Sequence, residues 1–182
     1  MPVTLHTPRL QLRPHALSDA AFMVRLNSDP EVVRYTGDGP LDLPGARGVV
    51  RYLHEKQHPF GMARLLVLRD GHPIGWCGLR RLSLEETPDL GYRFLRSAWG
   101  KGYATEASVA VLDHGFSVPD IHAVRAEADA RNPASIRVME RLGMTIQGPF
   151  EDDEGPYITA TLTRSDWLAH RDTVMDALAA RR

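Results

Sequence analysis

Hydrophobic and polar residues follow two different periods along this chain of 182 residues. In residues 7–14, leucines alternate with arginine and glutamine, which is typical of a strand with one buried face. From Ala104 to Leu112, apolar residues recur at helical spacing instead. Applied to the whole chain, these patterns predict strands at 7–14, 63–69, 72–82, 89–95, 121–128, 144–150 and 157–163. They predict helices at about 19–27, 44–55, 103–116, 133–142 and 164–180.

Turn-forming and capping residues set the boundaries of these elements. Ser18 is placed to cap the first helix, and the Asp-Pro pair at 29–30 to end it, because proline cannot continue the hydrogen-bond ladder. Residues 31–44 are expected to form a loop, and 70–71 and the acidic segment 151–155 to form hairpin turns. The order is β-α-α-β-β-β-α-β-α-β-β followed by a helix. Composition narrows this order only to the α/β or α+β class.

A turn with two glycines joins the predicted strand 89–95 to the helix after it. Gly100 and Gly102 allow backbone angles that other residues avoid, and they let a ligand approach the main chain closely. A helix that opens from such a turn directs unpaired N–H groups, and the positive end of its dipole, toward one point. The sequence therefore predicts an anion site here.

The spacing of this turn differs from the better-known phosphate loops. In a P-loop the lysine follows the second glycine, whereas Lys101 lies between Gly100 and Gly102. The dinucleotide fingerprint requires a third glycine where Thr105 stands. On spacing alone, an ordinary turn explains the glycines equally well.

Composition limits the class of protein. The chain is 43% hydrophobic with a formal net charge of −1, so we expect one domain over residues 1–182 and no direct nucleic-acid partner. A single cysteine, Cys77, excludes an internal disulfide and fits a core position in a reducing compartment. The chain shows no signal-peptide pattern and no apolar run of about 20 residues, so we expect a cytoplasmic protein without a membrane partner.

One motif suggests a metal site. His54, Glu55 and His58 fit the H-E-x-x-H signature of zinc proteases. The extended signature places a third histidine where Arg64 stands, and a cation there would repel the metal. We therefore expect a solvated helix end and no metal ion, and keep a zinc hydrolase as a minor alternative.

Three segments resemble the GNAT N-acetyltransferase superfamily, in particular the ribosomal-protein alanine N-terminal acetyltransferases. WGKGYATEA at 99–107, after LGYRF at 90–94, resembles the acetyl-CoA diphosphate loop. The superfamily pattern there is Gln/Arg-x-x-Gly-x-Gly/Ala; Gly102 and Ala104 match, and Trp99 takes the first position. NPASIRVMERLGM at 132–144 resembles a later helix, and TPRLQLRP at 7–14 the first strand.

The resemblance implies an α+β fold: a mixed, mostly antiparallel sheet flanked by helices, with a splay between the fourth and fifth predicted strands. It also implies acetyl-CoA as cosubstrate, with its diphosphate on the amides of about 101–105. The candidate cofactor-binding residues are Phe94, Leu95, Arg96, Gly100, Lys101, Gly102, Tyr103, Ala104, Thr105 and Asn132.

Acetyl transfer to an amine needs a neutral nucleophile, a stabilised oxyanion and a proton for the departing thiolate. The resemblance assigns the oxyanion to backbone N–H groups near Phe94 and Leu95, and the thiolate proton to Ser135. The candidate base is Asp89, with Glu106 as a second carboxylate near the loop. From the residues alone, Ser135 equally fits a helix residue that bonds the backbone, Asp89 a solvated carboxylate, and Glu106 a residue that offsets the helix dipole.

The resemblance implies a primary amine as acceptor, either a protein N-terminus or a small molecule, and it allows a homodimer. A non-catalytic acyl-CoA sensor is the main alternative. The acceptor itself is not readable, although residues 31–44 and the last hairpin are expected to decide it. The acidic run 151–154 fits attraction of a cationic acceptor, or simply a soluble turn.

Overall fold

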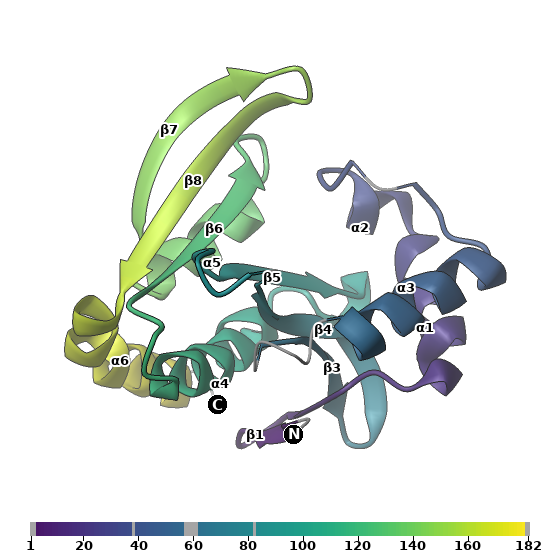
Figure 1. Cartoon of the computed structure of the whole chain (residues 1–182), viewed down its shortest axis with the longest axis horizontal. Coiled ribbons are helices and arrows are strands. Elements are labelled where there is room, and N and C mark those ends of the chain that lie inside the picture. The colour runs from purple at the N-terminus through teal and green to yellow at the C-terminus, as the bar shows by residue number, and fades with distance from the viewer. Residues whose placement is uncertain (1–2, 38, 57–61, 82, 181–182) are drawn as a thin grey trace.

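The computed structural model describes residues 3–37, 39–56, 62–81 and 83–180. Within these ranges the strands form one sheet in the order β1-β2-β3-β4-β5-β6-β8-β7 (Figure 1). The strands are β1 (Leu5–His6), β2 (Gln11–Arg13), β3 (Arg64–Arg69), β4 (His72–Arg80), β5 (Asp89–Phe94), β6 (Ala123–Asp129), β7 (Thr145–Asp152) and β8 (Gly155–Thr163). The helices are α1 (Ala20–Asn27), α2 (Pro30–Val33), α3 (Leu43–Lys56), α4 (Tyr103–Ser117), α5 (Pro133–Arg141) and α6 (Arg164–Ala179), with 3-10 turns η1 (Leu17–Asp19) and η2 (Arg96–Ala98).

Helices cover both faces of the sheet, and each face has its own core. On one face, α4 packs its apolar side chains against β4 and β5, with α5 and α6 beside it (Figure 1). Gly115 lets α4 lie close to β4, because a Cβ there would come within 2.4 Å of a Leu79 methyl group. On the other face, α1 and α3 pack against Leu66, Leu68 and Trp76.

The sheet opens between β5 and β6, as the resemblance implied. All other neighbouring strands are antiparallel, whereas β5 and β6 are parallel and share a single register pair, Asp89 with Arg125. The Arg125 N–H donates to the carbonyl of Pro88 at 2.9 Å, next to that pair. Beyond it the two strands diverge, so the predicted α+β class and splay are confirmed.

The first predicted strand is wrong at its start. Residues 7–10 form a tight turn, in which the Thr7 N–H donates to the Leu10 carbonyl at 2.9 Å, between the short strands β1 and β2. Glu106, far along the chain, holds this turn through the Thr7 hydroxyl and the Arg9 N–H. Buried and more exposed side chains do alternate at 9–13, as predicted. The contact with the distant Glu106, which bends the chain, cannot be predicted from the local sequence pattern.

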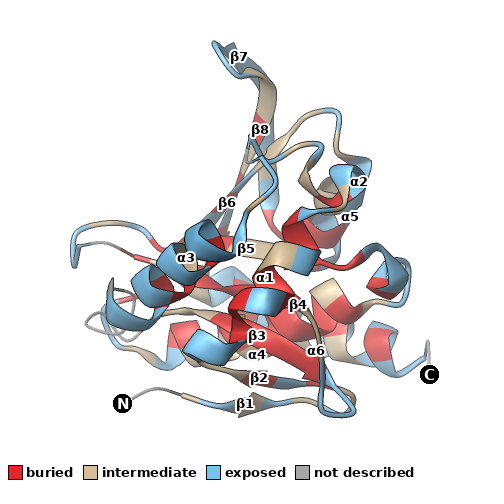
Figure 2. Cartoon of the chain, turned by 90° about the vertical axis from the view of Figure 1, so that its right-hand side faces the viewer, coloured by how far each residue is buried: buried red, intermediate tan, exposed pale blue. Residues whose placement is uncertain are grey.

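Three other boundaries differ from the predictions. Ser18 is an exposed residue within η1 and does not cap the first helix; the Asp19 carboxylate instead accepts the Ala16 N–H at 2.7 Å. Asp29 caps a new short helix, α2, so residues 31–44 are not wholly loop. The last hairpin is longer than predicted, since strands β7 and β8 continue to Asp152 and from Gly155. Their tip projects from the body and is exposed (Figure 2).

Among the described residues, none of the helices combines the length and the apolar character that crossing a membrane requires.

Candidate active site

The glycine turn has the conformation that the sequence predicted. Gly100 and Gly102 have φ angles of 74° and 77°, both in the left-handed region that favours glycine. Gly102 is the residue before α4, and its carbonyl accepts the Glu106 N–H at 3.0 Å. The N–H groups of Tyr103, Ala104 and Thr105 precede this bond, so the helix itself offers them no acceptor.

Further features of the turn fit an anionic ligand. The space where a Cβ of Gly100 would lie is open to 4 Å, so a ligand can approach the backbone. The hydroxyl of Thr105 is buried and has no hydrogen-bond partner among the described residues. A diphosphate supplies acceptor oxygens for such donors.

The two basic candidates beside the turn are exposed. Lys101 Nζ donates to the Ser97 carbonyl at 2.8 Å, and Arg96 begins η2. Trp99, at the first position of the motif, donates its indole N–H to the Phe94 carbonyl at 2.9 Å. The tryptophan therefore fixes the turn to the end of β5.

The N–H groups of Phe94 and Leu95 point in opposite directions. Leu95 donates its N–H to the Ile74 carbonyl at 2.9 Å. Because hydrogen bonds alternate along an antiparallel pair, the N–H of Phe94 faces away from β4, toward the gap with β6. The expectation that the Leu95 N–H lies free in the gap is wrong, whereas Phe94 keeps that geometry.

Asn132 and Ser135 lie together at the start of α5. The Asn132 side-chain oxygen accepts the Ser135 N–H at 3.2 Å, and its amide donates to the Ser135 hydroxyl at 3.2 Å. Tyr92 on β5 donates its hydroxyl to the Ser135 carbonyl at 3.1 Å, and burial raises the pKa of this tyrosine. Sequence reasoning missed Tyr92, although its two-residue spacing from Leu90 and Phe94 was a usable signal.

A cleft of about 570 Å³ extends from the gap across the sheet. It brings together Asp89, Tyr92, Asn132 and Ser135 under the segment after α2 and the β7–β8 hairpin. The residues of the glycine turn do not line this cleft. The predicted residues thus fall into two groups, one at the turn and one in the cleft, and β5 connects them.

Asp89 lies half-buried in the cleft beside arginines. Its carboxylate is 3.6 Å from the Arg64 guanidinium. Burial raises the pKa of Asp89, while Arg64, Arg80 and Arg125 oppose that rise. The carboxylate is thus held by long-range charge and one loose ion pair.

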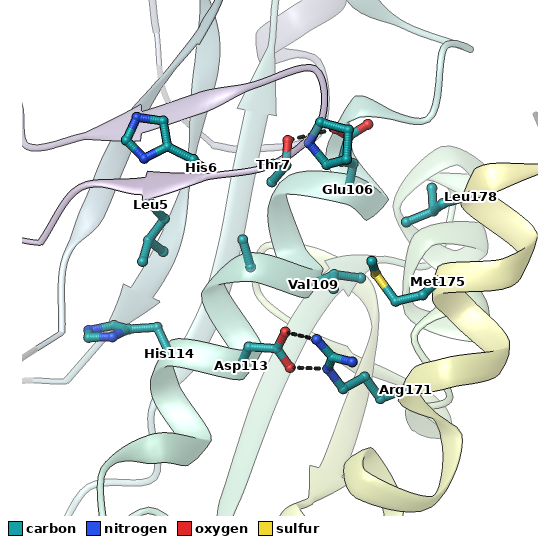
Figure 3. Close-up of a pocket in the computed structure, with 12 residues that line it drawn as sticks. Leu5, His6, Thr7, Glu106, Val109, Asp113, His114, Arg171, Met175 and Leu178 are labelled. Atoms are coloured by element: carbon teal, nitrogen blue, oxygen red, sulfur yellow. Dashed lines mark hydrogen bonds and ion pairs between the residues drawn. The ribbon is translucent and has the colours of Figure 1, made fainter. Parts of the chain in front are cut away.

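Glu106 has a different environment. It is 3% exposed and accepts hydrogen bonds from the Thr7 hydroxyl at 2.6 Å, the Arg9 N–H at 3.0 Å and Arg9 Nε at 2.6 Å. It borders a second cavity of about 420 Å³ between β1, α4 and α6, where Asp113 pairs with Arg171 at 2.7 Å (Figure 3). Glu106 is therefore a structural link between α4 and the N-terminal turn, and not merely a residue that offsets the helix dipole.

The described part of the zinc signature, His54 and Glu55, and the cysteine do not line the cleft. His54 and Glu55 are exposed near the end of α3, and His58 lies outside the described residues. Across the described part of the chain, no three His, Cys, Asp or Glu side chains gather as a metal site would require. Cys77 is fully buried against the Ser108 hydroxyl, at 3.6 Å, and burial raises its pKa to about 12, so it is a core cysteine as predicted.

Known proteins share both the sequence and the fold. A family model described as "Acetyltransferase (GNAT) domain" matches residues 9–145, and the chain therefore belongs to the GNAT acetyltransferase family. It is an N-acetyltransferase of that family, whose members use acyl-coenzyme A.

Individual relatives agree with this assignment. The chain is 31% identical over 155 residues to the uncharacterized N-acetyltransferase p20 of Bacillus licheniformis, covering 83% of this chain and 87% of p20. It is 25% identical over 141 residues to spermidine N(1)-acetyltransferase of Escherichia coli K12, covering 76% and 74%. In fold it is similar to the ribosomal L7/L12 α-N-protein acetyltransferase RimL in complex with coenzyme A, with a TM-score of 0.79, 16% identity and coverage of 88% and 97%.

Proposed function

We propose that this chain moves an acetyl group from acetyl-CoA directly to a primary amine, on a small molecule or a protein N-terminus, within a ternary complex. One observation supports this most strongly. Beyond Leu90, β5 leaves β6 and turns the N–H of Phe94 into a gap with the glycine turn at one end and the cleft of Asp89 and Ser135 at the other. Such a gap admits an extended thioester from one side and an amine from the other.

The glycine turn holds the cosubstrate in this proposal. The amides of Tyr103 to Thr105 and the Thr105 hydroxyl donate to the diphosphate oxygens, and Lys101 and Arg96 supply positive charge nearby. Acetyl-CoA contributes the activated acyl group. The chain contributes its placement along β5, so that the carbonyl meets the Phe94 N–H.

The Phe94 N–H stabilises the negative charge that develops on the thioester oxygen. A preorganised donor of this kind lowers the activation free energy of acyl transfer by about 3 kcal/mol. As the new carbon–nitrogen bond forms, the carbon–sulfur bond breaks, and the Ser135 hydroxyl gives its proton to the departing thiolate. The proton that the amine loses to Asp89 returns to Ser135 through water, so one proton passes in total from the amine to the thiol. Asn132 and Tyr92 hold Ser135 in place through its hydroxyl and its carbonyl.

The amine must lose a proton before or during attack. An α-amino group with a pKa of about 7.7–8.0 loses this proton at neutral pH at a cost of roughly 1 kcal/mol, against over 4 kcal/mol for a lysine. A weak base therefore suffices for an α-amine. Asp89 accepts the proton, directly or through water, and its partial burial strengthens it as a base.

A thiol-release assay tests this function. Acetyl-CoA is offered with peptides that begin with Ala, Ser or Met, with polyamines and with aminoglycosides. We expect turnover with at least one of these amines. Absence of both thiol release and calorimetric binding of acetyl-CoA would contradict the proposal.

Two glycine variants give this test a matched control. Gly100 and Gly71 have similar positive φ angles, 74° and 76°, and a Cβ at either would meet no atom within 4 Å. Alanine therefore introduces similar backbone strain at both. Only Gly100→Ala places a methyl group where the diphosphate approaches, so we expect it to raise the KM for acetyl-CoA about tenfold while Gly71→Ala leaves it unchanged. Equal effects would mean that the turn does not bind the cosubstrate.

A further inference from the structure

The floor of the cleft, formed by strands β3, β4 and β5, carries a net positive formal charge. The lining residues that come from the adjacent strands β3, β4 and β5 include three arginines but only one acid. These four charged residues are Arg64, Arg80, Arg93 and Asp89. Their formal charge sums to +2, although the whole chain has a formal charge of −1.

Glycines allow Arg64 to lie across this floor. Arg64 on β3 is in register with Gly78 on β4, which is in register with Gly91 on β5. A Cβ on Gly91 would lie 3.1 Å from Arg64 Nη2, so the guanidinium occupies the space above that glycine. It also stacks on the Trp76 ring, at 4.6 Å from the ring centroid. The sheet is thus built to present this cation to the cleft.

Arg80 on β4 and Arg93 on β5 extend the positive floor to either side of Arg64. Arg80 is directly opposite Asp89 in the sheet, and its buried Nε has no hydrogen-bond partner among the described residues. Arg93 adjoins Phe94, donates to the side-chain oxygen of Asn27, and lies over Trp76 at 5.7 Å. The four-residue step from Asp89 to Arg93 spans about 13 Å, the length of a short peptide.

The acidic residues of the same cleft lie elsewhere. Glu127 is exposed on β6, Asp129 is bound by Arg131 at 2.6 Å, and Asp152 and Glu154 are exposed at the hairpin tip. The acidic run 151–154 therefore forms part of the rim.

We propose, building on the function above, that the acceptor is a primary amine that also bears a side-chain carboxylate: an acidic amino acid, or a peptide whose residue after the N-terminus is acidic. The carboxylate binds the Arg64 and Arg80 guanidinium groups, and the amine extends along β5 toward the Phe94 N–H. Guanidinium groups bind carboxylates through paired, charge-assisted hydrogen bonds. A polyamine would bring like charges together on this floor.

Matched acceptors test this proposal. The thiol-release rate is measured with C-terminally amidated Ala-Glu-Ala, Ala-Gln-Ala and Ala-Lys-Ala, with free glutamate and glutamine, and with spermidine. We expect kcat/KM for the acidic peptide or amino acid to exceed that of its neutral partner at least tenfold, with Ala-Lys-Ala and spermidine lowest. The peptide and amino-acid arms distinguish the two sources of the carboxylate.

Variants of Arg80 test whether this residue causes the preference for acidic acceptors. Arg80→Gln should reduce the ratio of acidic to neutral kcat/KM at least fivefold, Arg80→Lys should keep most of it, and Arg80→Glu should invert it toward Ala-Lys-Ala. Arg51→Gln, at an exposed arginine of α3 outside the cleft, is the control and should keep the wild-type ratio.

The outcomes separate the two proposals. Turnover with equal or higher kcat/KM for neutral or cationic acceptors would overturn the carboxylate preference and leave the acetyltransferase function intact. No turnover with any acceptor, combined with no binding of acetyl-CoA, would overturn the function itself. The wild-type series decides the preference even if an Arg80 variant fails to fold.

Discussion

The two candidate carboxylates, Glu106 beside the glycine turn and Asp89 in the cleft, differ in how firmly the structure holds them. Glu106 is buried and accepts three hydrogen bonds of 2.6 to 3.0 Å from the N-terminal turn. Within the described residues, Asp89 has one ion pair, at 3.6 Å, at the edge of an open cleft. A carboxylate whose oxygens are fully used stabilises the fold, whereas one with unused oxygens is available to a substrate. Sequence proximity to the motif does not distinguish the two.

Removing the Glu106 charge should give the largest effect on stability. Glu106→Ala removes the carboxylate that pairs with Arg9 and accepts the short hydrogen bond of the Thr7 hydroxyl, and breaking a buried ion pair costs about 3 kcal/mol. Urea unfolding would measure this loss. An unchanged midpoint would show that the cluster does not hold the N-terminal turn.

Asp89→Asn should separate activity from stability. Because its ion pair is long and partly exposed, we expect less than about 1 kcal/mol of destabilisation. Loss of the base should lower kcat/KM about 100-fold at neutral pH. A shift of the optimum to higher pH, where the amine is already neutral, would accompany this loss. Wild-type activity in Asp89→Asn would exclude Asp89 as the base.

Ser135→Ala tests the leaving-group step. The Ser135 N–H keeps its bond to Asn132, so the helix cap survives and only the hydroxyl is lost. We expect kcat to fall roughly tenfold with little change in the KM for acetyl-CoA, because the hydroxyl acts as the thiolate departs. The effect should shrink with an acyl donor whose thiol is more acidic. A rise in KM with unchanged kcat would mean that Ser135 only binds.

Tyr92→Phe should give the smallest effect. It removes one hydrogen bond to the Ser135 carbonyl, a bond worth about 1 kcal/mol, while keeping the ring. We expect a fewfold loss of kcat that is absent when the same change is made in the Ser135→Ala background. An additive loss in the double variant would show that Tyr92 acts independently of Ser135.

Local patterns predicted the parts of this molecule that depend on local forces. The positive φ angles at Gly100 and Gly102, the Asn132 cap, and the order of strands from 63 onward all follow from spacing and turn chemistry. These features need no knowledge of distant residues. They were enough to recognise the resemblance to the family, and that resemblance in turn implied the splay.

The remaining features depend on pairing between distant segments. The turn at Thr7 needs Glu106, the direction of the Leu95 N–H depends on its register with Ile74, and the arginine floor forms only when Arg64 crosses β4 to reach β5. No period or motif in one segment contains this information. The acceptor preference that we propose rests on the same long-range contacts.

Residue-resolved amide hydrogen exchange with and without acetyl-CoA tests the central claim most directly. In the free protein the Leu95 N–H should exchange slowly, because Ile74 holds it, while the Phe94 N–H exchanges faster. Added acetyl-CoA should slow exchange at Phe94 and at Tyr103, Ala104 and Thr105 together. Exchange rates at these four amides that do not change on saturation would contradict the account.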